Sequence, residues 1–250
     1  MFILEKCSRY KVIVFDLDDT LIDNLENIRY AFRKMTEYFS ESYSDEKFEK
    51  WYKLDKLFWR KWQDGLIELP EDLKFETGKK SERFLNWVRA QRVIIYFENK
   101  ISLEEAINLN YVYMKALEKV VLPVEGVFET LKYLSETKRY HILVATNGPK
   151  IAAEEKLKKI KCRGFIEEVF SADMVGYMKP RKEFFDAIEL KFNYKKDEFL
   201  VVGDSLKSDI GLAEVCKIDS CWFDKKGDRN IGEYNPTLII NKLIELKNML

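Results

Sequence analysis

The first ordered pattern in the chain is the stretch KVIVFDLDDT, which occupies residues 11–20. Its first half is a short β-branched, apolar run of the kind that forms a buried strand, and its second half is rich in carboxylates. In open α/β sheets, ligands bind beyond the carboxyl ends of the strands. The stretch therefore predicts one strand of an α/β sheet with acidic chemistry at its end.

Four further short apolar runs follow in the second half of the chain. They lie at residues 141–145, 168–171, 199–202 and 220–223. Amphipathic stretches with helical periodicity alternate with them, at residues 127–136, 151–160 and 182–191. This alternation is typical of βα units that build a parallel sheet. We therefore expect an α/β fold with a doubly wound, Rossmann-like parallel sheet as its core.

Residues 24–120 follow a different pattern, in which apolar and aromatic positions recur every three or four residues. Four helices are predicted there, at residues 25–39, 45–63, 80–98 and 103–120. Ser44 and Ser102 are suited to cap two of these helices. Because the block follows the first strand, we expect an α-helical cap domain at residues 23–121, inserted into a core built from residues 1–22 and 122–250. An insert that leaves from this end of the strand would be positioned as a lid.

The aromatic side chains of this block are expected mainly to pack its helices together, because large aromatic residues are more often core than ligand platform. Two pairs are spaced to share a helix face and could instead stack on a substrate. They are Trp59 with Trp62, and Tyr111 with Met114.

The overall composition excludes several classes of partner. The 43 basic residues equal the 43 acidic ones, so no net field favours a nucleic acid polymer or an anionic membrane. The apolar runs fall far short of the roughly 20 residues of a transmembrane helix, and the N-terminus lacks the features of a secretory signal. We therefore expect a cytoplasmic protein. The Lys- and Glu-rich residues 154–161 are interpreted as a solvated helix face.

The cysteine and histidine pattern does not indicate a zinc site. Cys7, Cys162, Cys216 and Cys221 form neither a Cys-x-x-Cys pair nor a cluster with histidines, so a disulfide framework is not expected either. Cys216 and Cys221 lie in apolar stretches and are predicted to be buried and reduced. The one histidine, His141, begins a predicted strand far from any polar cluster, and we interpret it as structural.

Four polar clusters fall at the ends of successive predicted strands. They are residues 16–20, residues 146–148, Lys179 with Pro180, and residues 203–205 with Asp209. Converging carboxylates repel one another, so either their pKa values rise or a divalent cation balances them. The cation is the simpler interpretation, and oxygen ligands without a nearby His or Cys suit Mg²⁺. We therefore predict a Mg²⁺ site at this edge of the sheet, with Asp16 and Asp204 as direct ligands.

Asp16 and Asp18 are expected to carry the chemistry. An aspartate with the usual pKa of about 3.9 is ionised at neutral pH, so Asp16 can attack phosphorus without a separate base. Asp18 would point to the same side of an extended chain and could protonate the leaving oxygen and then accept a proton from water. Asp19 would point away from Asp18 and is expected to form a turn.

The remaining clusters are suited to hold a phosphate group. Thr146, Asn147 and Gly148 are expected where a strand turns into a helix, so a hydroxyl and backbone N–H groups could contact phosphate oxygens there. Lys179 would add a positive charge. Asp209 is expected to orient Lys179 or a metal-bound water rather than to bind the ion itself.

In this order, these residues resemble the motifs of the haloacid dehalogenase superfamily, in its Asp-x-Asp phosphatase branch with a helical cap after the first strand. The resemblance implies that Asp16 forms an aspartyl phosphate. It implies that Asp18 is the general acid and base and also ligates Mg²⁺ through its backbone carbonyl. Thr146 and Lys179 would bind the phosphate, and the acidic pair of Asp204 and Asp209 would complete the metal site.

Three further residues take supporting places in this predicted site. Leu17 and Asn147 are expected to contact the substrate phosphate beside Asp18. Thr20 is expected to support the metal site from behind, together with Asp209.

The details of the motifs narrow the branch. Dehalogenases lack the second Asp and phosphonate hydrolases carry a small residue there, so Asp18 argues against both. The runs TNG at residues 146–148, KPRKEFF at 179–185 and GDSLKSDI at 203–210 look most like the 5'-nucleotidase and N-acylneuraminate-9-phosphatase group. The expected substrate is a small phosphorylated metabolite, namely a nucleotide, a sugar phosphate or a short-chain phosphate. The alternatives are a sugar-phosphate mutase of the phosphoglucomutase kind and a non-catalytic metabolite-binding module on the same fold.

Overall fold

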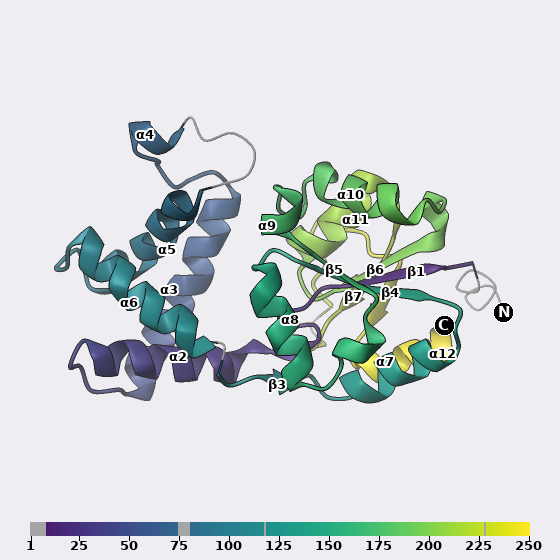
Figure 1. Cartoon of the computed structure of the whole chain (residues 1–250), viewed down its shortest axis with the longest axis horizontal. Helices are drawn as coiled ribbons and strands as arrows, with labels where there is room; N and C mark the ends of the chain where they lie inside the picture. Colours follow the sequence, from purple (N-terminus) through teal and green to yellow (C-terminus); the bar gives the residue numbers. More distant parts are fainter. Residues whose placement is uncertain (1–8, 75–80, 118, 228) are drawn as a thin grey trace. The chain divides into compact units, whose positions relative to one another are not determined.

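The computed structural model describes residues 9–74, 81–117, 119–227 and 229–250 (Figure 1). The chain forms two compact units. The sheet unit combines Met1–Asp23 with Leu122–Leu250, and the helical unit is Asn24–Val121. Cys7, the N-terminal segment and the first residue of the predicted helix at 80–98 lie outside the described residues.

A six-stranded parallel sheet forms the centre of the sheet unit, in the order β5-β4-β1-β6-β7-β8 (Figure 1). The strands are β1 Val12–Phe15, β4 His141–Thr146, β5 Glu168–Ser171, β6 Phe199–Gly203, β7 Asp219–Phe223 and β8 Leu238–Ile240. From β1 the chain moves outward through β4 to β5, returns to β6, and moves to the other edge. The predicted doubly wound α/β fold is confirmed, and β8 is an edge strand that the sequence pattern did not indicate.

Helices cover both faces of this sheet. They are α7 Val127–Glu136, α8 Lys150–Lys159, α9 Ala172–Val175, α10 Lys182–Phe192, α11 Gly211–Cys216 and α12 Leu246–Met249. In Figure 1, α10 and α11 lie on one side of the sheet and α7 and α12 on the other. Strands that are buried on both faces read as continuous apolar runs rather than alternating ones, and every residue of β1 and β6 is indeed buried.

The register of the central strands brings their carboxyl ends to one edge. Phe15, the last residue of β1, is paired with Val144 of β4 and with Val202 of β6. The polar residues that follow within two positions, Asp16 and Asp204 among them, therefore emerge side by side. Parallel pairing is what gathers segments that are far apart in the sequence.

A short antiparallel ladder marks the place where the helical insert leaves and rejoins the sheet unit. Strand β2, Ile22–Asp23, pairs with β3, Leu122–Pro123. Ile22 is opposite Pro123, and Asp23 is opposite Leu122. Two-residue strands show no periodicity, so the sequence pattern could not indicate them.

The helical unit contains all four predicted helices and one short additional one. They are α2 Asn24–Tyr38, α3 Asp45–Gln63, α4 Glu71–Lys74, α5 Glu82–Tyr96 and α6 Leu103–Leu117. The predicted N-caps are confirmed. Ser44 Oγ accepts a hydrogen bond from Lys47 N at 3.2 Å, and Ser102 and Glu105 cap each other's backbone N–H groups at 2.8 and 3.2 Å.

Aromatic side chains pack the helical unit from within, as predicted. Phe32 stacks on Trp51 with 5.8 Å between the ring centroids, and Tyr96 meets both rings edge-on at 5.5 Å. Trp59 and Trp62 pack partly buried against a second cluster around Phe84, whereas Tyr111 is 62% exposed. The aromatic content of the insert therefore serves mainly as its hydrophobic core.

Three further sequence-based expectations concern membrane-spanning helices, the cysteines and His141. No helix in the described part of the chain combines the length and apolarity needed to cross a bilayer. Cys216 and Cys221 are buried, as predicted, and burial raises the pKa of the Cys216 thiol to about 11. His141 contacts Glu167 through Nδ1 and Tyr194 through Nε2, which agrees with a structural role.

A buried ion pair lies inside the helical unit. Arg92 is 4% exposed, and its guanidinium donates hydrogen bonds to Asp55 and, at 3.1 Å, to Asn110 Oδ1. The rings of Trp51 and Tyr113 lie 5.5 and 4.9 Å from Arg92 Cζ. Removing one member of such a desolvated pair leaves the other charge buried without compensation.

We expect Arg92→Met to lower the free energy of unfolding by about 3 kcal/mol, because it leaves the Asp55 carboxylate buried and unpaired. The matched control is Arg83→Met. Arg83 pairs with Asp72 on the surface, with side chains 73% and 53% exposed, so its loss should cost less than about 1 kcal/mol. Urea denaturation followed by far-UV circular dichroism measures both values. Equal, small losses in the two variants would contradict the role of the buried pair.

Candidate active site

A buried lysine connects three segments at the carboxyl edge of the sheet. Lys179 is 3% exposed, and its Nζ donates hydrogen bonds to Asp16 Oδ1 at 2.7 Å, Asp209 Oδ1 at 2.7 Å and the carbonyl oxygen of Ala145 at 2.6 Å. An ammonium group has three donors, so all of them are satisfied. Lys179 therefore contacts both Asp16, the expected nucleophile, and Asp209.

Asn147 fixes the backbone from which this lysine extends. Its Oδ1 accepts a hydrogen bond from Lys179 N at 2.8 Å, and its Nδ2 donates to the carbonyl oxygen of Lys179 at 3.2 Å. The side chain of Asn147 is thus occupied by Lys179. A contact between Asn147 and a phosphate would have to come from its backbone N–H.

Hydrogen bonds with Thr20 and Trp222 hold Asp204 in the same cluster. Thr20 is fully buried, and its Oγ1 accepts from Asp204 N at 3.0 Å and donates to Asp204 Oδ1 at 3.3 Å. Trp222 Nε1 donates to the carbonyl oxygen of Asp204 at 2.8 Å. The structure therefore brings Thr20 into contact with Asp204 and adds Trp222, which no sequence pattern indicated.

Gly203 leaves the space that Asp209 occupies. A Cβ built on Gly203 would stand 2.2 Å from Asp209 Oδ2, far inside contact distance. Asp209 is 1% exposed, and its Oδ2 accepts a hydrogen bond from Ser205 N at 3.1 Å. The small residue at the end of β6 is thus a geometric condition for the position of the Asp209 carboxylate.

Burial and mutual repulsion control the charges of this cluster. Burial raises the pKa of Asp16 to about 7, although Lys179 acts in the opposite direction. Burial, together with repulsion from Asp16 and Asp209, raises the pKa of Asp204 well above its usual value. Burial acts to lower the pKa of Lys179, but the two neighbouring carboxylates raise it more, so Lys179 stays charged. In the absence of a cation, burial therefore opposes the full ionisation that an ordinary aspartate has at neutral pH.

The donor set of the cluster fits a hard divalent cation. One carboxylate oxygen from each of Asp16, Asp204 and Asp209 lies within 4.8 Å of the others. When all three carboxylates are ionised, they and the Lys179 ammonium leave two negative charges, which a dication would balance. All the donors are oxygens, which is the preference of Mg²⁺. Since Lys179 and Ser205 occupy both oxygens of Asp209, Asp16 and Asp204 are better suited to direct ligation.

Residues 16–23 form a tight turn that carries two more predicted site residues. The carbonyl oxygen of Leu17 accepts hydrogen bonds from Leu21 N and Ile22 N, both at 2.9 Å, so a phosphate contact from Leu17 would use its N–H. Asp19 has a positive φ of 68°, and its N–H donates to the carbonyl oxygen of Ile22 at 2.7 Å. The predicted turn role of Asp19 is confirmed.

The turn between β4 and α8 is the place where the sequence predicts a phosphate cradle. Thr146 is 2% exposed, and its Oγ1 accepts a hydrogen bond from Gly148 N at 3.0 Å. Helix α8 begins at Lys150, so the positive end of its dipole faces this turn. An anion in the turn could meet a hydroxyl, backbone N–H groups and the helix N-terminus together.

Asp18 enters the site with a partner that the sequence pattern did not indicate. Its Oδ1 accepts a hydrogen bond from Lys156 Nζ, and the Lys156 side chain is only 14% exposed. The interpretation of residues 154–161 as a solvated helix face is therefore wrong for Lys156. Its position beside the buried Ala153 and Leu157 on α8 was the available signal.

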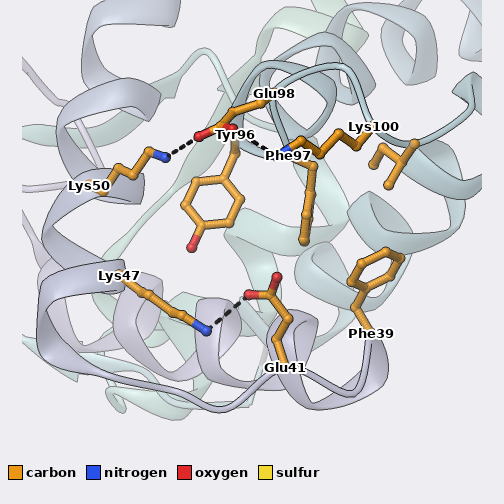
Figure 2. A pocket seen from close by; sticks show the side chains of 9 residues that line it. Phe39, Glu41, Lys47, Lys50, Tyr96, Phe97, Glu98 and Lys100 are labelled. Atoms are coloured by element: carbon orange, nitrogen blue, oxygen red, sulfur yellow. Dashed lines mark hydrogen bonds and ion pairs between the residues drawn. The ribbon is translucent and has the colours of Figure 1, made fainter.

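A separate pocket lies within the helical unit (Figure 2). Its lysines are already paired with carboxylates. Lys47 lies 3.2 Å from Glu41, and Lys50 and Lys100 each lie 3.0 Å from Glu98. None of its lining residues belongs to the Asp16 cluster. The Asp16, Asp204 and Asp209 cluster therefore lies in the sheet unit, outside this pocket.

The sequence is similar to those of known proteins. A sequence model of the family described as haloacid dehalogenase-like hydrolase matches residues 10–216. YjjG of Escherichia coli, a pyrimidine 5'-nucleotidase, is 25% identical over 241 residues, which cover 95% of this chain and 96% of YjjG. The glyceraldehyde 3-phosphate phosphatase of Pyrococcus furiosus is 29% identical over 219 residues, 86% of this chain and 81% of that protein.

Solved structures show the same fold. The crystal structure of YfnB from Bacillus subtilis, which is named as a HAD-hydrolase and was determined bound to magnesium, superposes with a TM-score of 0.83. The two chains are 23% identical, and the match covers 97% of this chain and 99% of that one. At this level of identity the likeness shows the fold alone.

We expect Gly203→Ala to destabilise the protein by about 2 kcal/mol, because the added Cβ forces the Asp209 carboxylate off Lys179 and overpacks the end of β6. Gly164→Ala is the matched control, since nothing lies within 4 Å of a Cβ at Gly164. Guanidinium denaturation of both variants tests this expectation. A Gly203→Ala protein as stable as the control would show that Asp209 does not need this space.

Proposed function

This chain belongs to the haloacid dehalogenase-like hydrolase family, which matches residues 10–216, and we propose that it hydrolyses small phosphomonoesters in a Mg²⁺-dependent reaction. The observation that carries the proposal is the contact of one buried lysine with two of three converging aspartates, at 2.7 Å each. Relatives named as a pyrimidine 5'-nucleotidase and a glyceraldehyde 3-phosphate phosphatase support it.

Asp16 is the proposed nucleophile. One of its oxygens attacks phosphorus, the bond between phosphorus and the leaving oxygen breaks, and an aspartyl phosphate forms on Asp16. Lys179, hydrogen-bonded to Asp16 Oδ1, fixes the orientation of the carboxylate and adds positive charge where the phosphate oxygens would lie. Orientation and charge neutralisation are what phosphoryl transfer mainly requires from a protein.

Asp18 is the proposed general acid and base. In the first step it gives a proton to the leaving oxygen, which takes the electron pair of the broken bond. In the second step a water attacks phosphorus, Asp18 takes a proton from that water, and the bond between Asp16 and phosphorus breaks to release phosphate. Thr146 and the backbone N–H groups of the turn at residues 146–148 hold the phosphate oxygens through both steps.

Asp16 and Asp204 would hold the Mg²⁺ ion, with the backbone carbonyl of Asp18 as a third protein ligand. The bound ion would neutralise the excess negative charge of the carboxylates and of the phosphate. Asp209 and Thr20 support this set by holding Lys179 and Asp204, respectively. We propose a small phosphorylated metabolite as substrate, either a nucleotide, a sugar phosphate or a short-chain phosphate.

Replacing the nucleophile should abolish turnover. We expect Asp16→Asn to lower kcat for p-nitrophenyl phosphate by at least about 10³-fold, because an amide cannot form the covalent intermediate. Asp186→Asn is the control, since Asp186 pairs with Lys182 on an exposed helix face and should leave kcat unchanged. Phosphate release is measured for the aryl ester and for a panel of nucleotides and sugar phosphates. An active Asp16→Asn protein would overturn the proposed mechanism.

Removal of the metal should have two effects. Protein treated with EDTA is expected to lose phosphate release and to recover it when Mg²⁺ is added back. Mg²⁺ at 100 times its Kd should also stabilise the fold by about 2.7 kcal/mol, and Asp204→Asn should remove most of this stabilisation. Full activity in EDTA, or the same stabilisation by Mg²⁺ in the Asp204→Asn variant, would contradict the assigned ligands.

A further inference from the structure

Lys156 makes an unusual contact for a lysine in a charged helix. Its ammonium donates a hydrogen bond to Asp18 Oδ1, from a position 138 residues away in the sequence. The Lys156 side chain is 14% exposed and that of Asp18 is 37% exposed. Lysines are rarely this buried unless they are paired. The contact between Lys156 and Asp18 is therefore partly buried at the edge of the candidate active site, and it is not an ordinary surface ion pair.

The second oxygen of Asp18 points toward the phosphate cradle. Asp18 Oδ2 lies 3.9 Å from where a Cβ on Gly148 would stand, and Thr146 Oγ1 lies 3.4 Å from the same point. One carboxylate oxygen is thus held by Lys156, while the other lies beside the turn that binds phosphate in the proposed reaction. A general acid and base needs such an arrangement, because one oxygen must be held in place while the other transfers the proton.

Helix α8 connects the cradle and the lysine rigidly. It starts at Lys150, directly after the turn at residues 146–148, and Ala153 and Leu157 anchor it in the core. Lys156 lies about 9 Å along the helix axis from its first residue. Side chains in a helix tilt toward its N-terminus, so a long lysine can reach back to Asp18.

We propose that Lys156 is a positioning residue that holds the Asp18 carboxyl group with Oδ2 facing the leaving oxygen of the substrate. The inference rests on the proposed function and adds Lys156 to the residues that support the proposed reaction. It makes Lys156 act through Asp18, without touching the substrate. Because the pair is partly exposed, its contribution to the stability of the fold is small.

The test compares two substrates that depend differently on the general acid. Phenyl phosphate has a poor leaving group and needs a proton on the leaving oxygen, whereas 2,4-dinitrophenyl phosphate needs it far less. The readout is kcat/KM, which covers the steps through departure of the leaving group. The variants are Lys156→Met, which keeps the length of the side chain without its charge, and Lys156→Arg, which keeps the donor.

The matched control is Lys158→Met. Lys158 lies on the same helix, pairs with Glu155 at 2.8 Å and is 59% exposed. The Lys158→Met substitution removes the same charge from α8 but leaves the contacts of Asp18 unchanged. A loss shared by the two Met variants would reflect the general field of the helix rather than the contact.

We expect Lys156→Met to lower kcat/KM for phenyl phosphate by about tenfold, which is a part of the ~10²- to 10⁴-fold that general acid catalysis supplies in full. The loss for the dinitrophenyl ester should be less than about threefold. Lys156→Arg should restore most of the activity. In an Asp18→Asn background, Lys156→Met should have no further effect, because the two residues act as one unit.

Two results would overturn the inference while leaving the proposed function intact. Equal losses for both esters with a raised KM would make Lys156 a phosphate-binding residue. A full additional loss in the Asp18→Asn background would show that Lys156 acts independently of Asp18. If the wild-type protein releases phosphate from neither ester, the proposed function fails first, and the role of Lys156 falls with it.

Discussion

The burial of a single ammonium group, that of Lys179, is the constraint on which the site depends. A charge out of water is costly unless every donor meets an acceptor. Here the acceptors come from the end of β1, the end of β4 and the short π-helical segment Leu206–Ile210 after β6. The lysine is stable only when all three segments have reached their final register. Correct assembly of the sheet and correct assembly of the site are consequently one event.

The arrangement around this lysine keeps like charges close at a cost in stability. Thr20 and Trp222 hold Asp204 near Asp16 from behind, at hydrogen-bond distances of 2.8 to 3.3 Å. The pKa of Asp204, raised first by burial and then by repulsion from Asp16, reflects the cost of this proximity. Proteins tolerate such strain at functional sites, where the same groups are needed to meet a ligand of opposite charge. The rest of the sheet unit, with its fully buried central strands, provides the compensating stability.

The fold and the main polar clusters were predictable because each has a local signal. Buried parallel strands read as apolar runs, and Asp16, Thr146 and Asp204 follow such runs within two residues. What the sequence could not indicate depends on side-chain reach across the fold. Lys156 looks like any lysine of a charged helix until its contact with Asp18 is seen. The hydrogen bond from Trp222 to the Asp204 carbonyl, and the two-residue strands β2 and β3, likewise leave no periodic trace.

The ladder between β2 and β3 also bears on how such a protein can diversify. Since Asp23 is opposite Leu122, the two residues that flank the helical unit are anchored at neighbouring points. An insertion whose ends meet can be lengthened, shortened or exchanged without moving the strands that carry it. Recombination at this junction could therefore alter the helical unit while the carboxylates and Lys179 stay in register. The residues of the proposed reaction can thus be retained in the sheet unit while the sequence of the helical unit changes.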